Sequence, residues 1–174
     1  APASQTASQH RLARIQVYNW GTFSGYHDLP VPRDGLLLTG PSGSGKSSLL
    51  DALSAVLVPA KNLRFNAAAQ ESSSTADRSR SVLSYVRGAY RRSADEITGE
   101  VVTDYLRAGA PRSGVALTFT RLDPGETITL VKLFHARQGS TSANSVSQTQ
   151  LLVEGDIALT GLMEYLTNGI DRQA

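Results

Sequence analysis

Residues 40–47 read Gly-Pro-Ser-Gly-Ser-Gly-Lys-Ser and match the pattern G-x-x-x-x-G-K-[ST]. Glycines in this pattern let the backbone curl so that successive N–H groups point at phosphate oxygens. The lysine of the pattern reaches the β- and γ-phosphates of a nucleotide, and the hydroxyl that follows binds Mg²⁺. The sequence therefore predicts a phosphate-binding loop (P-loop) with Lys46 as its cation and Ser47 as its magnesium ligand.

The segments on either side of this loop fit the motif. Residues 36–39 form a short apolar run, which is typical of a strand buried on both faces. Residues 47–58 carry leucine and valine at helical spacing, and Pro59 ends that pattern. We therefore expect a strand, the loop and a helix, with the helix N-terminus adding partial positive charge at the phosphates.

The rest of the chain predicts an α/β fold: a mixed sheet with the P-loop helix on one face and an antiparallel β-subdomain on the other. Residues 123–126 (Asp-Pro-Gly-Glu) are a strong hairpin signal. Residues 1–10 are expected to be a disordered leader, and residues 138–150 a polar loop. The other expected elements are strands at 12–18, 26–31, 101–106, 115–122 and 127–135, a second hairpin from 151–153 and 157–159, a helix within 82–90 and a last helix from 162–166.

Composition excludes several classes of protein. The 174 residues include no cysteine, which excludes a disulfide scaffold and a cysteine-ligated metal, and the three histidines are scattered. No apolar run approaches the roughly 20 residues that cross a bilayer, and the first ten residues lack a signal-peptide pattern. The sequence thus favours a soluble cytoplasmic chain without a membrane partner, trimmed at its start and a fragment of a longer protein.

A complete ATPase site needs an acidic residue at the end of a buried strand to hold the Mg²⁺ shell. Asp123 and Glu154 follow apolar segments, but both are more typical of turns. No signature of the Leu-Ser-Gly-Gly type occurs either. The sequence therefore predicts a chain that binds nucleotide but holds only part of a catalytic site.

Two other residues near the motif have structural interpretations. Trp20 is expected to pack in the core, with a place in the wall of the nucleotide pocket as the alternative. Asp51 lies four residues after Ser47, on the same face of the expected helix, and a structural hydrogen bond is expected there.

Three stretches resemble the start of SMC-like ATPases. They are residues 19–23 (Asn-Trp-Gly-Thr-Phe), residues 39–53 around the P-loop, and residues 84–90 (Ser-Tyr-Val-Arg-Gly-Ala-Tyr). The resemblance is strongest to the MukB-like branch, which includes the MksB (JetC) ATPases of the Wadjet plasmid-defence systems. It covers roughly residues 12–92.

The resemblance implies that residues 11–174 are the N-terminal lobe of an ABC/SMC-type head. In that family a C-terminal lobe of the same protein, beyond a coiled coil, supplies the acidic strand and the signature. ATP and Mg²⁺ are then held between two heads of a homodimer, with kleisin and kite-type subunits, on double-stranded DNA. The implied role is ATP-driven chromosome condensation or plasmid defence at the nucleoid, with the isolated lobe nearly inactive as an ATPase.

The same resemblance implies roles for individual residues. Gly21 and Thr22 correspond loosely to residues that touch the nucleotide. A glutamine helps to coordinate Mg²⁺, and Gln138, Gln148 and Gln150 are its candidates. Arg64 resembles an arginine near the nucleotide or DNA. The expected nucleotide-binding residues are Gly40, Pro41, Ser42, Gly43, Ser44, Gly45, Lys46, Ser47, Ser48, Gly21 and Thr22, with Ser47 and Gln138 as metal ligands.

Residues 61–92 are basic although the whole chain carries a net charge of only +2. Seven lysines and arginines stand against two acids there, which would favour sequence-independent phosphate contacts with DNA, unless the segment is simply a solvated face. The candidates are Arg64, Arg78, Arg80, Arg87, Arg91 and Arg92.

Three alternatives stay open from the residues alone. The chain could belong to an ABC-type or AAA-type ATPase that does not act on DNA. It could be a small P-loop kinase, although neither an acidic strand nor a substrate lid is evident. It could also be a DNA-binding module with a vestigial P-loop.

Overall fold

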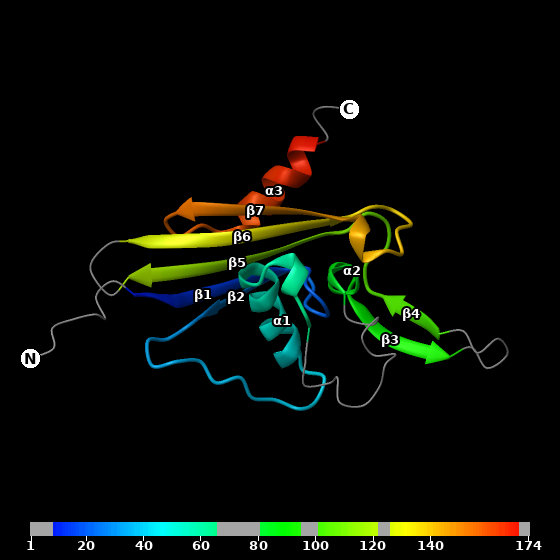
Figure 1. The fold of residues 1–174 in the computed structure, drawn as a ribbon, viewed down its shortest axis with the longest axis horizontal. Helices are drawn as coiled ribbons and strands as arrows, with labels where there is room; N and C mark the ends of the chain where they lie inside the picture. Colours follow the sequence, from blue (N-terminus) through cyan, green and yellow to red (C-terminus); the bar gives the residue numbers. More distant parts are fainter. Residues whose placement is uncertain (1–8, 66–80, 95–100, 122–125, 171–174) are drawn as a thin grey trace, which may run out of the picture.

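The computed structural model describes residues 9–65, 81–94, 101–121 and 126–170. Their main feature is a five-stranded sheet in the order β2-β1-β5-β6-β7, with every neighbouring pair antiparallel (Figure 1). The strands are β1 (His10–Tyr18), β2 (Tyr26–Pro30), β5 (Arg112–Arg121), β6 (Thr127–Ala136) and β7 (Val146–Glu154).

Helices cover both faces of this sheet. On one face, α1 (Lys46–Leu57) and α2 (Val82–Arg87) pack on alternate strand residues such as Val17 and Val115. On the other face, α3 (Leu159–Ile170) packs on the residues between them, such as Ala116. This alternation follows from the two-residue period of a strand, which sends successive side chains to opposite faces.

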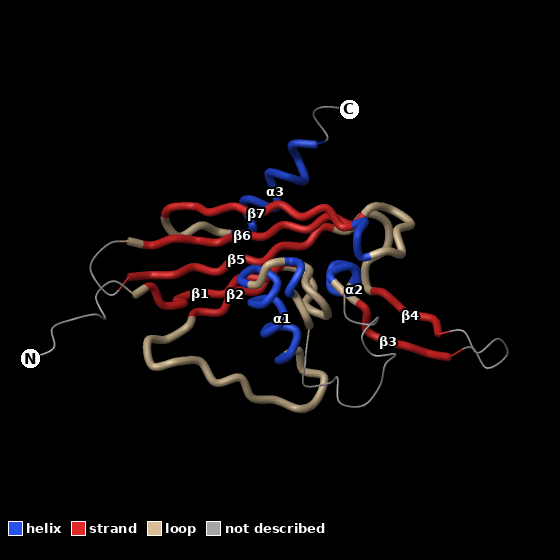
Figure 2. Tube along the Cα trace, in the orientation of Figure 1, coloured by secondary structure: helices blue, strands red, loops and turns tan. Residues whose placement is uncertain are grey.

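A two-stranded hairpin, β3 (Ala89–Ala94) with β4 (Val101–Tyr105), extends away from the sheet beside α2 (Figure 2). Ser81 begins α2 with a capping box, in which its hydroxyl accepts from the N–H of Ser84. Gly88 ends the helix in the left-handed region, at φ +68°, and turns the chain into β3. Two short 3₁₀ turns, η1 (Ala60–Asn62) and η4 (Ala143–Ser145), complete the described elements.

The expected strand at residues 36–39 is wrong. The chain from β2 to α1 runs as a long loop away from the sheet (Figure 1), and no described strand pairs with it. Leu37 is 85% exposed and Leu36 is 40% exposed, whereas Leu38 packs partly against the core. The expected mixed sheet is wrong as well. With residues 36–39 outside the sheet, every pair of described strands is antiparallel.

Three further boundaries differ from expectation. Gly88 ends the second helix earlier than residue 90. The predicted polar loop 138–150 includes the first half of β7, an edge strand whose polar residues face solvent. His10 already belongs to β1, inside the expected leader. The α1 helix, β4 and the pairing of β5 with β6 confirm the prediction, with shifts of a few residues.

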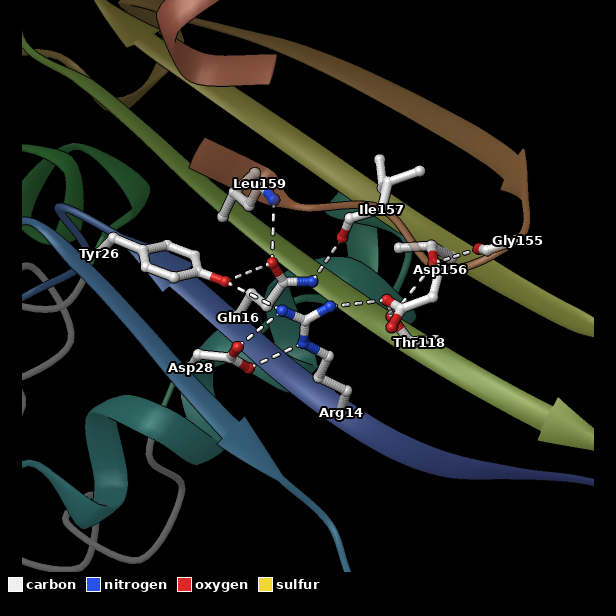
Figure 3. A network of polar contacts seen from close by, with 10 residues as sticks. Arg14, Gln16, Tyr26, Asp28, Thr118, Gly155, Asp156, Ile157 and Leu159 are labelled. Atoms are coloured by element: carbon white, nitrogen blue, oxygen red, sulfur yellow. Dashed lines mark hydrogen bonds and ion pairs between the residues drawn. The ribbon is translucent and has the colours of Figure 1, made fainter. Parts of the chain in front are cut away.

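The second predicted hairpin is also wrong, because a polar network draws residues 155–159 onto the sheet (Figure 3). The buried Gln16 amide donates to the Ile157 carbonyl at 2.8 Å and accepts from the Leu159 N–H at 2.9 Å. Arg14 forms ion pairs with Asp28 at 2.6 Å and with Asp156 at 2.9 Å. These contacts hold the start of α3 on the sheet, so no second strand forms there.

None of the helices in the described ranges is long and apolar enough to cross a membrane.

Candidate functional site

The P-loop forms a tight curl in front of α1. Gly40, Gly43 and Gly45 all have positive φ, at 151°, 82° and 93°, which an L side chain adopts only with strain. The Lys46 ammonium lies inside the curl and donates to the carbonyls of Gly40 at 2.7 Å and Pro41 at 2.8 Å, and to the Ser44 hydroxyl at 3.2 Å. The loop thus concentrates main-chain groups around one cation.

The first turn of α1 adds main-chain donors next to that cation. Gly45 is the N-cap and provides no side-chain acceptor, and the first turn contains no acidic residue. The side chain of Ser47 is exposed at this end. Unsatisfied N–H groups, the helix dipole and a lysine together suit a phosphate group, and a serine hydroxyl at this position suits its magnesium ion.

An aromatic core holds α1 in place. The fully buried indole of Trp20 donates to the Ser48 carbonyl at 2.9 Å and stacks on the Tyr85 ring, with 4.8 Å between ring centroids. The Tyr85 hydroxyl donates to the buried Asp51 carboxylate. The core position expected for Trp20 and the structural hydrogen bond expected at Asp51 are both confirmed.

The structure brings Gly21 to the start of the same helix. A Cβ atom added at Gly21, where φ is +57°, would lie 3.5 Å from the Ser48 Cβ and 3.1 Å from the Tyr85 ring. The Gly21 N–H donates to the Tyr85 carbonyl at 2.8 Å, and Thr22 follows as an exposed residue. Gly21 thus lies beside the P-loop helix, and the contact of Gly21 and Thr22 with nucleotide stays a prediction.

The candidate glutamines fall in different places. Gln148 and Gln150 line a cavity of about 420 Å³ together with Val58 and Pro59 at the C-terminal end of α1. A helix of 12 residues is about 18 Å long, so this cavity lies at the opposite end from the P-loop. Gln138 is exposed in the turn after β6. No described group of three or more His, Cys, Asp or Glu residues could hold a metal ion by itself.

The arginines of the basic segment, residues 61–92, also lie in different surroundings. Arg64 and Arg91 are exposed. Arg87 is only 8% exposed, donates to the Arg137 carbonyl at 3.0 Å and lies over the Tyr105 ring, so its assignment to a DNA surface is wrong. Arg78, Arg80 and the side chain of Arg92 lie outside the described residues.

Two described acidic residues in the second half of the chain, Asp156 and Glu154, lie away from the P-loop. Asp156 binds Arg14 and accepts from Thr118 at 3.1 Å, on the face of the sheet that carries α3. Glu154 ends the edge strand β7 and is exposed. Asp123 lies outside the described residues. Within the described ranges, the site therefore consists of a P-loop and a helix N-terminus without an acidic strand end.

Phe23, which contacts the P-loop, and Arg107, which contacts the Gly21–Phe23 loop, carry no signal of their own in the sequence. The ring of Phe23 packs on Gly45, since an added Cβ there would lie 2.9 Å from its Cζ. Arg107 donates to main-chain carbonyls of residues 21, 23, 85 and 86. No pattern in the sequence signals Arg107, because its acceptors are main-chain atoms far away along the chain.

A comparison with protein families agrees with this geometry. A family model described as the P-loop containing region of AAA domain matches residues 12–72, about a third of the chain. No curated protein matches the chain. The matched region spans β1, β2, the P-loop and α1, and supports a nucleotide-binding region of the P-loop NTPase type.

Proposed function

We propose that this chain is the ATP-binding N-terminal lobe of an SMC-like ATPase head of the MukB-like branch. The observation that carries the proposal is the P-loop, whose glycine curl surrounds Lys46 directly before the uncapped N-terminus of α1. Main-chain N–H groups and Lys46 would hold the phosphates, and Ser47 would hold Mg²⁺. The metal supplies positive charge that offsets the charge developing on the phosphates.

The proposal that a second lobe completes the site draws support from residues 36–39. An apolar segment next to a nucleotide site is expected to be a buried strand, yet Leu37 is 85% exposed. Strands supplied by a C-terminal lobe would pair with this segment and cover its leucines. The same lobe would bring the acidic residue that P-loop hydrolysis requires.

The test is steady-state ATP hydrolysis by the purified chain, measured over a range of protein concentrations. We expect saturable binding of Mg·ATP with almost no turnover, because the described residues offer no acid to the Mg²⁺ shell. A brisk rate per molecule that survives dilution, and that is lost in Lys46→Ala, would contradict the incomplete-site proposal.

DNA binding is the finer part of the proposal and involves the exposed Arg64 and Arg91. Phosphate contacts predict binding to a short duplex that weakens steeply with salt, independently of its sequence. Replacing both arginines by alanine should weaken that binding, whereas Arg33→Ala, an exposed arginine outside the basic segment, should not. Equal DNA binding by the wild type, the double variant and Arg33→Ala would contradict the proposed DNA contact of Arg64 and Arg91.

A second candidate is an AAA-type ATPase lobe that does not act on DNA. The description of the matching family favours it, since it names an AAA domain. This candidate shares the nucleotide site and differs in predicting no salt-dependent binding of DNA. The duplex-binding experiment therefore separates the two.

A further inference from the structure

Arg107 follows β4, and its side chain holds the loop of residues 21–23, which we call the braced loop. Its Nη2 donates to the Gly21 carbonyl at 2.6 Å and to the Tyr85 carbonyl at 3.1 Å. Its Nε donates to the Val86 carbonyl at 2.8 Å, and its Nη1 to the Phe23 carbonyl at 3.4 Å. One side chain thus ties residues 21–23 to the end of α2.

The chemistry of this contact requires an arginine. The guanidinium is half-buried, burial lowers its pKa, and no ion pair with an acidic side chain is found for it among the described residues. Its hydrogen bonds to the described residues all run to main-chain carbonyl oxygens, four of them from one guanidinium, which suits a planar fork of donors. A lysine ammonium is a compact group on a flexible stem and could not reach the same set.

The braced loop packs directly against the P-loop. Phe23, whose carbonyl accepts from Arg107, places its ring on Gly45, so that an added Cβ there would lie 2.9 Å from the ring. Gly45 has φ +93° and is the N-cap of α1, directly before Lys46. A shift of the Phe23 ring would therefore loosen the turn that sets the position of Lys46.

We propose that Arg107 is a positioning residue for nucleotide binding, acting through Phe23 and Gly45 on the P-loop. The inference rests on the proposed function, since it concerns the same nucleotide site. It also connects the β3–β4 hairpin to that site, because Arg107 lies two residues beyond β4 and the main chains of Arg107 and Arg87 are hydrogen-bonded at 3.0 Å. Arg107 itself does not contact the P-loop motif in any described hydrogen bond.

The test compares Arg107→Met with a matched control, Arg112→Met. Arg112 is also partly buried and donates to a main-chain carbonyl, that of Leu166 at 2.9 Å, but it lies against α3 on the other face of the sheet. Dissociation constants for a fluorescent ATP analogue with Mg²⁺ are measured well below the melting temperature of every variant. Circular dichroism first establishes that each variant is folded.

We expect Arg107→Met to weaken nucleotide binding by about tenfold or more, since small displacements of a positioned group have large effects. Arg112→Met should bind as the wild type does, even if its melting temperature falls. Arg107→Lys should remain weakened, because charge without the fork does not restore the brace. Wild-type affinity in Arg107→Met or in Arg107→Lys would overturn the inference.

A double-mutant cycle tests whether Arg107 acts through Phe23. Phe23→Ala should weaken binding as Arg107→Met does, and the double variant should be little weaker than either single variant. Fully additive losses would overturn the route through Phe23. If Arg107→Met does not fold, Phe23→Ala against the wild type carries the test, and wild-type affinity in it overturns the inference. A wild type that binds no Mg·ATP would instead overturn the proposed function itself.

Discussion

The indole Nε1 of Trp20 donates to the main-chain carbonyl of Ser48 at 2.9 Å, which joins the segment directly after β1 to the first turn of α1. The same indole stacks on Tyr85 and contacts Phe134 from the sheet. Helix α1 is therefore fixed at its nucleotide end by the core, although the segment before the P-loop pairs with no described strand.

Trp20→Phe should destabilise the protein by about 2 kcal/mol, because it removes the hydrogen bond to Ser48 and leaves space in a fully buried site. Urea unfolding measures the loss. Tyr90→Phe is the control, since Tyr90 is 57% exposed and its hydroxyl should contribute little. Equal stabilities of the two variants would contradict the anchoring role of Trp20.

Two glycines with nearly the same backbone angle should respond differently to alanine. Gly88 has φ +68° and Gly109 has φ +69°. An alanine at either position would therefore hold a left-handed backbone conformation, which costs about 1 kcal/mol. At Gly88 the new Cβ would also lie 2.7 Å from the Gly21 carbonyl oxygen, whereas at Gly109 nothing lies within 4 Å. Thermal unfolding should therefore show a clearly larger loss for Gly88→Ala. A loss of the same size at both positions would show that the Gly21 loop is not packed there.

Asp28 should contribute stability that acid removes. Its hydrogen bonds to Arg14 hold the pKa of its carboxyl below the ordinary value, so the contribution is present above about pH 4 and is lost as the pH falls through the folded-state pKa. Asp28→Asn should lower the urea midpoint at neutral pH and bring it closer to the wild-type midpoint near pH 3. Asp34→Asn, at an exposed turn, serves as the control and should follow the wild type at both pH values. An unchanged gap between Asp28→Asn and the wild type would contradict this assignment.

Because of Lys132, the free energy of unfolding should increase as the pH rises into the alkaline range. It is 6% exposed and donates to the Ala55 carbonyl near the end of α1 at 2.8 Å, and burial lowers its pKa below the ordinary value of 10.5. The folded state then binds fewer protons than the unfolded state just below that value, so stability increases as the pH rises through the folded-state pKa. Melting temperatures of the wild type relative to Lys132→Met should rise toward about pH 10. The control is Lys61→Met, at an exposed lysine, whose melting temperature should follow that of the wild type over the whole pH range. If the melting temperatures of the wild type and of Lys132→Met change with pH in parallel, the effect is excluded.

The sequence predicted the elements that depend on local patterns. The P-loop, α1 and the hairpin of β5 and β6 follow from glycine spacing, helical periodicity and an Asp-Pro-Gly turn. It failed at residues 36–39 because an apolar run indicates burial without indicating what buries it. It failed at residues 157–159 because Gln16, more than a hundred positions away, supplies the hydrogen bonds that turn the chain toward α3.

The surroundings of the nucleotide site were less accessible to sequence reasoning. Arg87 belongs to a basic stretch, and only the fold shows that its guanidinium is buried beside Tyr105. Gln148 and Gln150 lie on β7, at the end of α1 that is remote from the P-loop. Charge and spacing along a chain do not determine which end of a helix a distant strand will meet.

The most direct measurement is the melting temperature of the wild type, Lys46→Ala and Lys61→Ala with and without Mg·ATP. A ligand at about 100 times its dissociation constant stabilises the folded state by about 2.7 kcal/mol, which is a rise of several degrees. We expect that rise in the wild type and in Lys61→Ala, and none in Lys46→Ala. The same rise in all three proteins, or no rise in any of them, would contradict a phosphate-binding site built around Lys46.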